Sequence, residues 1–389
     1  MTVCIIRNAE AETNAGIIRV VDALLDINIM PLTLTRTRFS EINNKRIILK
    51  NFHHNKTIIK NYELQLKTDM GKGIRNISPL IAYQYLTLTW LIKNRKKYTE
   101  LHAFDLDAGI PALLASKILR KKFVYHIADF YVDSRKGIPS IIKNIIKKIE
   151  FKLISKAQAT IICTEERKEQ IRGSKPNKLY VVHNTPVVQY ESEKLLKEGK
   201  LNEGKIKETY KLEICYVGGL FETRFINQLI KIIKNNPEIS LSIAGLGPLE
   251  NVVREAAESC ENIKYHGRVS YNRALDLYRE CDLMFAMYDP NIPNHKFSAP
   301  NKVYEAMMLR KPIIVANGTG IDKIVQREKI GFSIDYEEKD FIETLNHIIH
   351  NPSQIEYLSD NSKIAYEKYS WEIMKGRLQE IYKTLLNQE

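Results

Sequence analysis

The chain has 389 residues, of which 44% are hydrophobic and 27% are charged. This length exceeds what a single hydrophobic core usually supports, so we expect two domains in a folded soluble protein. No apolar run reaches the roughly 18–20 residues that span a bilayer, and the first residues lack the pattern of a secretory signal peptide. Five scattered cysteines without a CxxC pair favour buried free thiols, as in a cytoplasmic protein.

Positive charge is concentrated in the first half of the chain. Residues 1–200 contain 35 Lys and Arg against 19 Asp and Glu, a net charge of +16. Residues 201–389 contain 24 Lys and Arg against 27 Asp and Glu, a net charge of −3. This asymmetry points to an anionic partner of the first half: a membrane surface, a lipid-phosphate acceptor or a nucleic acid. A generally lysine-rich composition would not explain the difference between the halves.

Residues 1–188 alternate short apolar strands with amphipathic helices. This alternation predicts a first α/β domain, with a parallel sheet covered by helices on both faces. The expected strands lie near 2–7, 30–36, 46–51, 100–104, 123–127, 159–163 and 179–182. The expected helices lie at about 14–28, 77–97, 108–120, 138–156 and 165–172.

A charged segment, 189–211, interrupts the alternation and has little to bury, which suits an interdomain linker. The alternation resumes over 212–369, starting with a strand that runs into Gly218-Gly219. Further strands are expected near 239–244, 263–266, 282–286, 312–316 and 331–334. Helices are expected at about 224–235, 248–258, 271–280, 300–309, 321–328, 338–351, 352–368 and 370–387. Two α/β halves joined by a linker predict a cleft, with ligands at the carboxyl ends of parallel strands.

Two glycine turns follow successive strands of the second half. Gly218-Gly219 precedes the helix expected from Arg224, and Gly245-Leu246-Gly247-Pro248 follows the next strand. A glycine turn before a helix N-terminus offers backbone N–H groups and the positive end of the helix dipole to a phosphate. Each turn by itself is more often only a turn. Neither matches GxGxxG or GxxxxGK[ST], so a nicotinamide dehydrogenase and a P-loop enzyme are not indicated.

Residues 298–305 carry the strongest signal for an anion site. Ser298 is placed to cap a helix that Pro300 opens. Lys302 then lies in the first turn, where a cation opposes the helix dipole unless an anionic phosphate docks there. Glu305, one turn later, is suited to accept hydrogen bonds from ribose hydroxyls. By spacing alone, the alternative is a surface ion pair between Lys302 and Glu305.

Taken together, these segments resemble the donor domain of the retaining glycosyltransferases of family 4. The resemblance implies the GT-B architecture, an α/β fold in which two Rossmann-like domains face each other across a cleft. It covers about residues 213–335, and looser matches lie upstream in residues 1–188, the acceptor-binding domain. Its carriers are 216–219, 243–248, 265–270, 281–283, 298–307 and 311–315, with 124–131 and 182–186 upstream. The C-terminal helix, 370–389, is similar to the family's tail, which crosses back onto the N-terminal domain.

The resemblance also implies roles for individual residues. Glu305 matches the second glutamate of the family's E-x7-E motif, which holds the donor ribose. The first glutamate falls on Phe297, and this departure puts the contacts to the donor sugar hydroxyls in doubt. Arg224 matches one member of a basic pair, whereas Leu220 occupies the other position. The remaining donor-binding residues are expected to be Gly218, Gly219, Gly245, Arg268, Val269, Ser298, Pro300 and Asn301.

Three residues are expected to be catalytic: Asp129, Arg224 and Lys302. Asp129 matches an acceptor-domain position where the family often carries His or Asp facing the donor sugar. The alternative for Asp129 is a cap at a strand end. Arg224 and Lys302, with main-chain donors, are expected to stabilise the charge that grows on the leaving diphosphate.

Two other polar groups carry weaker signals. Asp105 and Asp107 form a DxD triplet, which binds a metal in another glycosyltransferase architecture, but helix capping explains it better here. His53-His54 lies in polar sequence, which favours solvated side chains. We therefore expect no metal site and no cofactor, since the nucleotide sugar is a substrate.

The resemblance implies a transferase that moves a sugar from a UDP- or GDP-sugar to a saccharide or lipid-linked acceptor with retention, in cell-surface polysaccharide or glycolipid assembly. The basic residues of 120–122 and of the helix at 138–156 favour an anionic membrane surface over nucleic acid, because aromatic platforms do not alternate with them. We expect a cytoplasmic protein, peripheral at the inner face of the cell membrane. The alternatives are a nucleotide-sugar epimerase and a non-enzymatic protein that binds membranes or nucleic acids.

Overall fold

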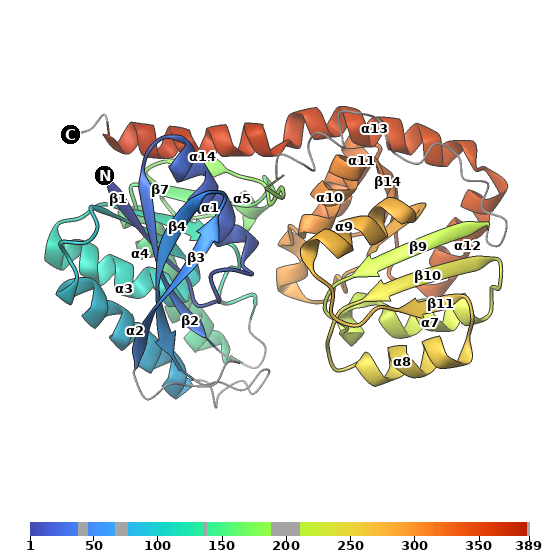
Figure 1. The fold of residues 1–389 in the computed structure, drawn as a ribbon, viewed down its shortest axis with the longest axis horizontal. Coiled ribbons are helices and arrows are strands. Elements are labelled where there is room, and N and C mark those ends of the chain that lie inside the picture. The colour runs from blue at the N-terminus through green and yellow to red at the C-terminus, as the bar shows by residue number, and fades with distance from the viewer. Residues whose placement is uncertain (38–45, 67–76, 135–137, 188–210, 387–389) are drawn as a thin grey trace. The chain divides into compact units, whose positions relative to one another are not determined.

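The computed structural model describes residues 1–37, 46–66, 77–134, 138–187 and 211–386. The chain divides into two compact units (Figure 1). Unit 1 comprises Met1–Val187 and Trp371–Glu389, and unit 2 comprises Val188–Ser370. Apart from residue 211, the linker expected at 189–211 lies outside the described residues.

Unit 1 is built on an eight-stranded sheet with the order β3-β4-β2-β1-β5-β6-β7-β8. Neighbouring strands are parallel except for the β3–β4 pair. The strands are β1 (Thr2–Ile6), β2 (Met30–Thr37), β3 (Ile47–His54), β4 (Thr57–Gln65), β5 (Glu100–Phe104), β6 (Phe123–Ile127), β7 (Ala159–Ile162) and β8 (Leu179–Val181). The helices are α1 (Ala15–Asp26), α2 (Ile77–Lys93), α3 (Asp105–Leu119), α4 (Ser140–Lys156), α5 (Arg167–Gln170) and α14 (Trp371–Leu386).

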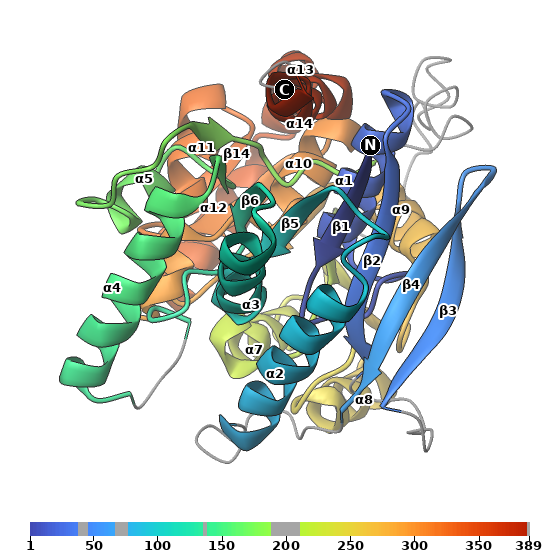
Figure 2. The same ribbon diagram turned by 90° about the vertical axis from the view of Figure 1, so that its left-hand side faces the viewer.

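Two hydrophobic cores sandwich this sheet. One core joins the sheet to α2, α3 and α4, and the other joins it to α1 and α14. Figure 2 shows α2, α3 and α4 on the side of unit 1 that faces the viewer. Apolar residues at helical spacing produce this arrangement, because each helix turns a buried stripe towards the sheet.

The edge of the sheet differs from the prediction. A strand was expected at 46–51, but β3 continues to His54 and pairs with β4, which the sequence pattern did not reveal. Asn55, in the two-residue loop between the two strands, has a positive φ of 51°, which suits a tight hairpin. His54 is buried and its Nε2 lies 2.7 Å from Asp22 Oδ1, so the expectation of a solvated side chain was wrong for His54.

The C-terminal helix α14 is part of the core of unit 1. Trp371 Nε1 donates to Asp22 Oδ2 at 2.8 Å, and Arg377 Nη1 donates to the Val181 carbonyl oxygen at 2.8 Å. Deeper in the core, the Tyr382 hydroxyl lies 2.5 Å from His102 Nδ1. Burial, with a smaller contribution from nearby positive charge, lowers the pKa of His102 to about 3, so this imidazole is neutral at physiological pH.

Unit 2 has a six-stranded sheet, all parallel, with the order β11-β10-β9-β12-β13-β14. The strands are β9 (Leu212–Val217), β10 (Ile239–Ala244), β11 (Ile263–Tyr265), β12 (Leu283–Ala286), β13 (Ile313–Ala316) and β14 (Gly331–Ile334). The α-helices are α7 (Ile226–Lys234), α8 (Glu250–Ser259), α9 (Tyr271–Glu280), α10 (Asn301–Leu309), α11 (Ile321–Glu328), α12 (Glu338–His350) and α13 (Ser353–Tyr369). Two 3-10 turns, η2 (Glu222–Arg224) and η3 (Pro293–Phe297), lie in the loops after β9 and β12.

Helices cover both faces of the second sheet. One core contains α7, α8 and α12, and the other contains α9, α10, α11 and α13. Because all six strands are parallel, their carboxyl ends lie along one edge, and the loops that follow them meet there. This edge is called the carboxyl edge of unit 2 below. It collects the residues that the sequence assigned to donor binding.

Candidate functional site

The two glycine turns interlock at the carboxyl edge of unit 2. The Gly218 N–H donates to the Ala244 carbonyl at 2.9 Å, and the Gly245 N–H donates to the Gly267 carbonyl at 2.8 Å. Gly245 has a φ of 139°, and a Cβ there would overlap the carbonyl oxygen of Gly218. Only glycine therefore fits at Gly245. The result is a closely packed floor of backbone at the ends of β9, β10 and β11.

Lys302 extends over the first of these turns. Its ammonium lies so close to Gly218 that a Cβ on that glycine would be 2.8 Å from Lys302 Nζ. The same ammonium lies 5.2 Å from the centre of the Tyr216 ring, within the range of a cation–π contact. The structure thus brings together Gly218 and Lys302, which are 84 positions apart in the sequence. Gly218 lies in the turn after β9, and Lys302 lies in the first turn of α10.

The electrostatic surroundings keep Lys302 charged. Burial by itself lowers the pKa of the Lys302 ammonium, whereas Tyr288, Tyr216 and Glu305 raise it. The nearby positive charge of Arg224 lowers it again, and the net pKa lies above its ordinary value. Lys302 is therefore a permanent cation at physiological pH, as a phosphate-binding group must be.

Glu305 is buried in α10, with only 5% of its surface exposed. This burial contradicts the alternative of a solvent-exposed ion pair with Lys302. Two details of the expected helix start were also wrong. The helix begins at Asn301, and its N-cap is Pro300, which makes no side-chain capping bond. The Ser298 hydroxyl instead donates to the Thr319 carbonyl at 3.3 Å, so Ser298 ties the α10 loop to the loop after β13.

Arg224 lies in η2 rather than in the first turn of a longer helix, because Phe225 adopts a left-handed conformation with a φ of 62° and α7 begins only after it. Arg224 Nη1 lies 2.8 Å from His295 Nε2, and its guanidinium stacks 3.8 Å from the centre of the Tyr288 ring. His295 Nδ1 lies 2.8 Å from the Asp289 carbonyl oxygen. With a proton on Nδ1 donated to that carbonyl, Nε2 is left as the acceptor for Arg224.

His295 and Tyr288 are the residues that sequence reasoning missed. Both are buried, both come from the loop between β12 and α10, and both hold the guanidinium of Arg224. A polar residue and an aromatic residue in a loop at the carboxyl edge of a sheet indicate a binding site in general. The pattern alone, however, does not show which arginine they hold.

The other predicted donor residues lie in neighbouring loops. Gly219 follows Gly218, and the Tyr216 hydroxyl donates to its carbonyl at 2.7 Å. Arg268 and Val269 lie in the loop between β11 and α9, where Arg268 is exposed and Val269 packs partly against the core. Phe297, which replaces the motif's first glutamate, is half-buried at the end of η3.

Unit 1 presents different chemistry at its own carboxyl edge. Asp129 is exposed just after β6, and its backbone N–H donates to Asp105 Oδ1 at 2.8 Å. The same Asp105 oxygen accepts the N–H of Ala128 at 2.8 Å. Asp105 therefore holds the loop that carries Asp129, and the expectation that it caps α3 was wrong. The N-cap of α3 is Phe104, which makes no side-chain capping bond.

Asp105 has an unusual backbone conformation and a raised side-chain pKa. It has a φ of 58°, which is rare outside glycine and costs conformational energy. Burial and the neighbouring charge of Asp129 raise its pKa, whereas Arg7 and the two N–H donors lower it, and the net pKa is about 6. The other aspartate of the triplet, Asp107, accepts a hydrogen bond from Asn8 Nδ2 at 2.8 Å. Both carboxylates are thus engaged with the protein.

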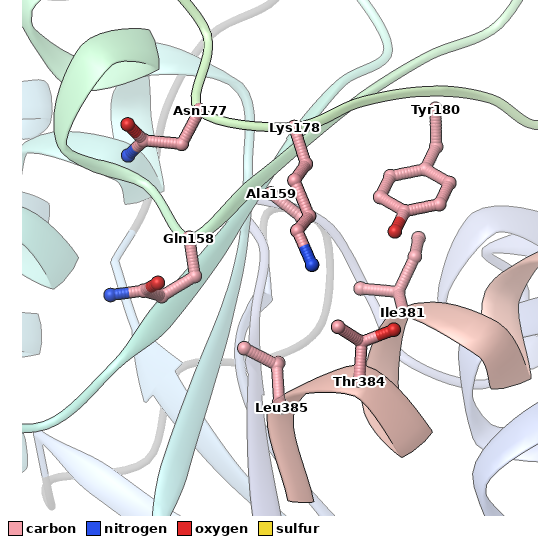
Figure 3. Close-up of a pocket in the computed structure, with 8 residues that line it drawn as sticks. All are labelled: Gln158, Ala159, Asn177, Lys178, Tyr180, Ile381, Thr384 and Leu385. Atoms are coloured by element: carbon pink, nitrogen blue, oxygen red, sulfur yellow. The ribbon is translucent and has the colours of Figure 1, made fainter. Parts of the chain in front are cut away.

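A pocket of about 200 Å³ lies elsewhere in unit 1 (Figure 3). It is lined by Gln158, Ala159, Asn177, Lys178, Tyr180, Ile381, Thr384 and Leu385. Ala159 begins β7 and Lys178 precedes β8, so the pocket lies at the amino ends of these strands. Ligands of parallel α/β sheets bind at the opposite, carboxyl ends. The pocket is therefore separate from the candidate site.

Comparison with known proteins gives a family match for part of the chain. Residues 198–365, which contain every predicted donor residue, match the family model of the glycosyl transferases group 1. The capsular polysaccharide biosynthesis glycosyltransferase CapM of Staphylococcus aureus is 24% identical over 366 residues, covering 85% of this chain and 92% of that protein. An uncharacterised glycosyltransferase of Methanocaldococcus jannaschii is 25% identical over 252 residues, covering 63% of this chain and 65%, just under two thirds, of that protein.

Solved structures share the fold over the whole chain. Sucrose-phosphate synthase from Thermosynechococcus elongatus superposes with a TM-score of 0.73 at 14% identity, covering 100% of both chains. Anabaena HepE in complex with UDP and glucose superposes with a TM-score of 0.65 at 14% identity, covering 98% of both chains. At these identities the likeness shows the fold alone, that of the GT-B glycosyltransferases. Residues 198–365 therefore match the glycosyl transferases group 1, and the chain is built on the fold of the GT-B glycosyltransferases.

Proposed function

We propose that this protein transfers a sugar from a UDP- or GDP-sugar to a saccharide or lipid-linked acceptor with retention of the anomeric configuration. The observation that carries this proposal is the position of the Lys302 ammonium over the Gly218 turn, with Arg224 held nearby by His295 and Tyr288. One cation over the glycine turn and a second one nearby fit a diphosphate, because charge-assisted hydrogen bonds to phosphate are strong and directional.

Two similar proteins support this choice of ligand. HepE was crystallised with UDP-glucose as well as with UDP. CapM of Staphylococcus aureus acts in capsular polysaccharide biosynthesis. We therefore place the transfer in the assembly of a cell-surface polysaccharide or glycolipid, with Glu305 accepting hydrogen bonds from the donor ribose.

The reaction requires little beyond the residues already named. The bond from the anomeric carbon to the diphosphate oxygen breaks, and a bond from that carbon to the acceptor oxygen forms on the same face of the sugar. The acceptor hydroxyl proton passes to an oxygen of the leaving phosphate. Lys302 and Arg224 stabilise the negative charge that grows on this diphosphate in the transition state. Asp129 of unit 1 orients a hydroxyl of the transferred sugar.

Calorimetric titration of the purified chain with UDP, GDP and their sugars tests the proposal. One nucleoside diphosphate should bind, and its sugar should be consumed when a saccharide acceptor is present. Proton NMR of the first product formed gives the anomeric configuration relative to the donor. Absence of binding to every nucleoside diphosphate would contradict the donor site. Epimerisation of the sugar without transfer would assign the site to a nucleotide-sugar epimerase.

A further inference from the structure

Helix α4 of unit 1 has an apolar side that faces solvent. Ile141, Ile142, Ile145 and Ile149 are exposed by 74, 47, 54 and 40%, respectively. Three of them are spaced four residues apart and form one stripe along the helix. Further along the same helix, Leu153 and Ile154 pack into the core. An apolar stripe on a helix is normally covered along its length, whereas the stripe of α4 is covered only near its C-terminal end.

The neighbouring helices continue this pattern. Leu114 and Ile118 of α3 are exposed by 42 and 59%, and Ile81 and Tyr85 of α2 by 61 and 66%. Helices α2, α3 and α4 share one hydrophobic core with the sheet, so their outer sides form one layer of the surface. Eight of the twenty large apolar side chains found exposed in the described part of the chain lie on these three helices. Such clustering, unlike scattered exposure, indicates an interaction surface.

The exposed charges of this layer are all positive. Lys93 of α2, Lys117 of α3, and Lys148, Lys152 and Lys156 of α4 are exposed, whereas Lys143 and Lys147 of α4 are half-buried. The three helices contain only three acidic residues. Glu150 is fully buried, Asp107 is 7% exposed, and Asp105 binds the backbone of the next loop. The solvent side of the layer therefore combines isoleucines with lysines.

A helix of unit 2 shows what an ordinary solvent side looks like. Helix α8 exposes Val252 together with Arg254, Glu255 and Glu258, so one apolar residue stands among charges of both signs. Protein interfaces are usually depleted in lysine and enriched in aromatic residues, which does not describe the isoleucine and lysine side of α4. Interfacial membrane helices combine apolar residues that enter the lipid boundary with lysines that meet anionic headgroups.

We propose that the solvent side of α4, extended by the outer sides of α2 and α3, docks the protein on the surface of an anionic lipid membrane. The isoleucines enter the boundary between headgroups and acyl chains, and Lys148, Lys152 and Lys156 contact lipid phosphates. This surface deepens the proposed function, since a membrane-docked enzyme is placed where lipid-linked acceptors are. It rests on unit 1 alone and does not depend on the donor site.

The sequence favoured two basic segments, 120–122 and the helix at 138–156, for contact with an anionic membrane. The structure favours the second of them. Of the residues at 120–122, Lys121 donates to the Tyr98 carbonyl oxygen, and Lys122 Nζ lies 3.4 Å from the Leu385 carbonyl oxygen. Both ammonium groups are thus turned towards the protein. The α4 lysines, in contrast, lie beside exposed isoleucines, so α4 is the part of the basic half to test.

Sedimentation of the full chain with vesicles tests the docking surface. The vesicles contain phosphatidylcholine either alone or mixed with phosphatidylglycerol. The wild-type chain should bind the mixed vesicles at low salt and be released as salt screens the contact. Ile141→Asn combined with Ile145→Asn, and separately Lys148→Glu combined with Lys152→Glu, should each reduce binding by about tenfold or more. The matched control, Lys363→Glu with Ile364→Asn, changes an exposed pair on α13 of unit 2 and should bind as wild type.

A fluorescence probe tests insertion directly. Trp90 and Trp371 are the only tryptophans and both are buried, so a tryptophan introduced by Ile145→Trp reports the α4 surface. Its emission should shift to shorter wavelength with anionic vesicles, whereas that of Ile364→Trp should not.

Three outcomes would overturn the proposal: equal binding to neutral and anionic vesicles, wild-type binding by both α4 variants, or an α4-dependent dimer without vesicle binding. UDP and GDP titrations of the same variants should match wild type. Loss of nucleotide binding is therefore a separate result from loss of docking.

Discussion

The carboxyl edges of the two sheets have the same backbone architecture and opposite chemistry. In unit 2 the edge carries Lys302 over the Gly218 turn, and Arg224 held by His295. In unit 1 the edge carries the carboxylates of Asp105 and Asp129, and the nearby charge of Arg7 stabilises the ionised form of Asp105. Parallel sheets gather loop residues at this edge in either case.

The difference suits the two kinds of ligand that our proposal assigns to the two edges. Fixed cations and backbone N–H groups suit a diphosphate, whose charge they match in the ground state and more strongly in the transition state. Exposed carboxylates suit hydroxyl groups, because they accept hydrogen bonds and repel phosphates. The net charges of the two halves of the sequence are opposite to what these two edges would suggest. The neutral half binds the anionic donor in our proposal, so the excess charge of the first half needs another explanation, which α4 provides.

The largest effect is expected at Lys302. Lys302→Ala should weaken binding of UDP or GDP by about tenfold or more, since a hydrogen bond to a charged group contributes about 1.5–3 kcal/mol. Transfer should fall further, because the leaving group gains charge in the transition state. Calorimetry and initial rates measure the two effects.

Lys234→Ala is the matched control for Lys302→Ala. Lys234 is exposed at the last residue of α7, and its Nζ lies 3.2 Å from Ser259 Oγ. It lies at the end of α7 that leads into β10, away from the carboxyl edge. Binding of diphosphate by Lys302→Ala at the wild-type level would show that the proposed donor site is wrong.

The second prediction concerns the carboxylate edge. Asp129→Asn should reduce turnover by about tenfold to a hundredfold while nucleoside-diphosphate affinity stays nearly unchanged, because the proposed partner is the transferred sugar. The backbone N–H of residue 129 keeps its bond to Asp105, so the loop should stay in place. A variant that loses thermal stability yet keeps its specific activity would support the strand-end cap instead.

The sequence predicted most of the fold because most strands and helices in the two units carry a clear apolar pattern. The hairpin at β4 escaped prediction because Asn51, Lys60 and Asn61 interrupt the apolar alternation of the two strands. The register of β3 and β4 depends on pairing within the sheet, which local pattern does not record. His54 lies at the end of this hairpin, and its burial against Asp22 follows from that pairing.

The candidate site was predictable as a set of residues but not as a set of contacts. Lys302 was identified because a cation in a helix's first turn conflicts with the dipole, and Glu305 because it matches the second glutamate of the E-x7-E motif. The support of Arg224 by His295 and Tyr288 depends on how the loop after β12 folds over η2, which no helical or strand period describes. The role of Ser298 was mistaken for the same reason, since its partner Thr319 lies 21 residues away.

The third prediction separates the ribose from the diphosphate. Glu305→Gln should weaken nucleoside, monophosphate and diphosphate by a similar factor of about three to ten, because the lost charge serves a hydroxyl group common to all three. Lys302→Ala should instead weaken only the phosphorylated ligands. The glutamine is nearly the same size as the buried glutamate, so packing in α10 is conserved. If Glu305→Gln weakens diphosphate but leaves free nucleoside unchanged, the ribose role is wrong.

The last prediction concerns stability, rather than ligand binding or turnover, at the edge of unit 1. Burial and the charge of Asp129 raise the pKa of Asp105 to about 6, against the opposing effect of Arg7. As the pH rises from about 4 to about 6, the unfolded chain therefore releases this proton before the folded chain does, and the aspartate destabilises the fold. Above about pH 6 the penalty is complete and stays constant. An asparagine at this position cannot ionise, yet its Oδ1 still accepts the N–H groups of Ala128 and Asp129.

The free energy of unfolding of Asp105→Asn, relative to wild type, should therefore be more favourable at pH 7 than at pH 4, by up to about 3 kcal/mol. Asparagine also tolerates the positive φ at this position. Both tryptophans belong to unit 1, so urea unfolding followed by tryptophan fluorescence reports that unit alone. A difference between variant and wild type that does not change with pH would show that Asp105 titrates near its ordinary pKa. In that case the Arg7 guanidinium, rather than burial, would dominate the electrostatics of this edge.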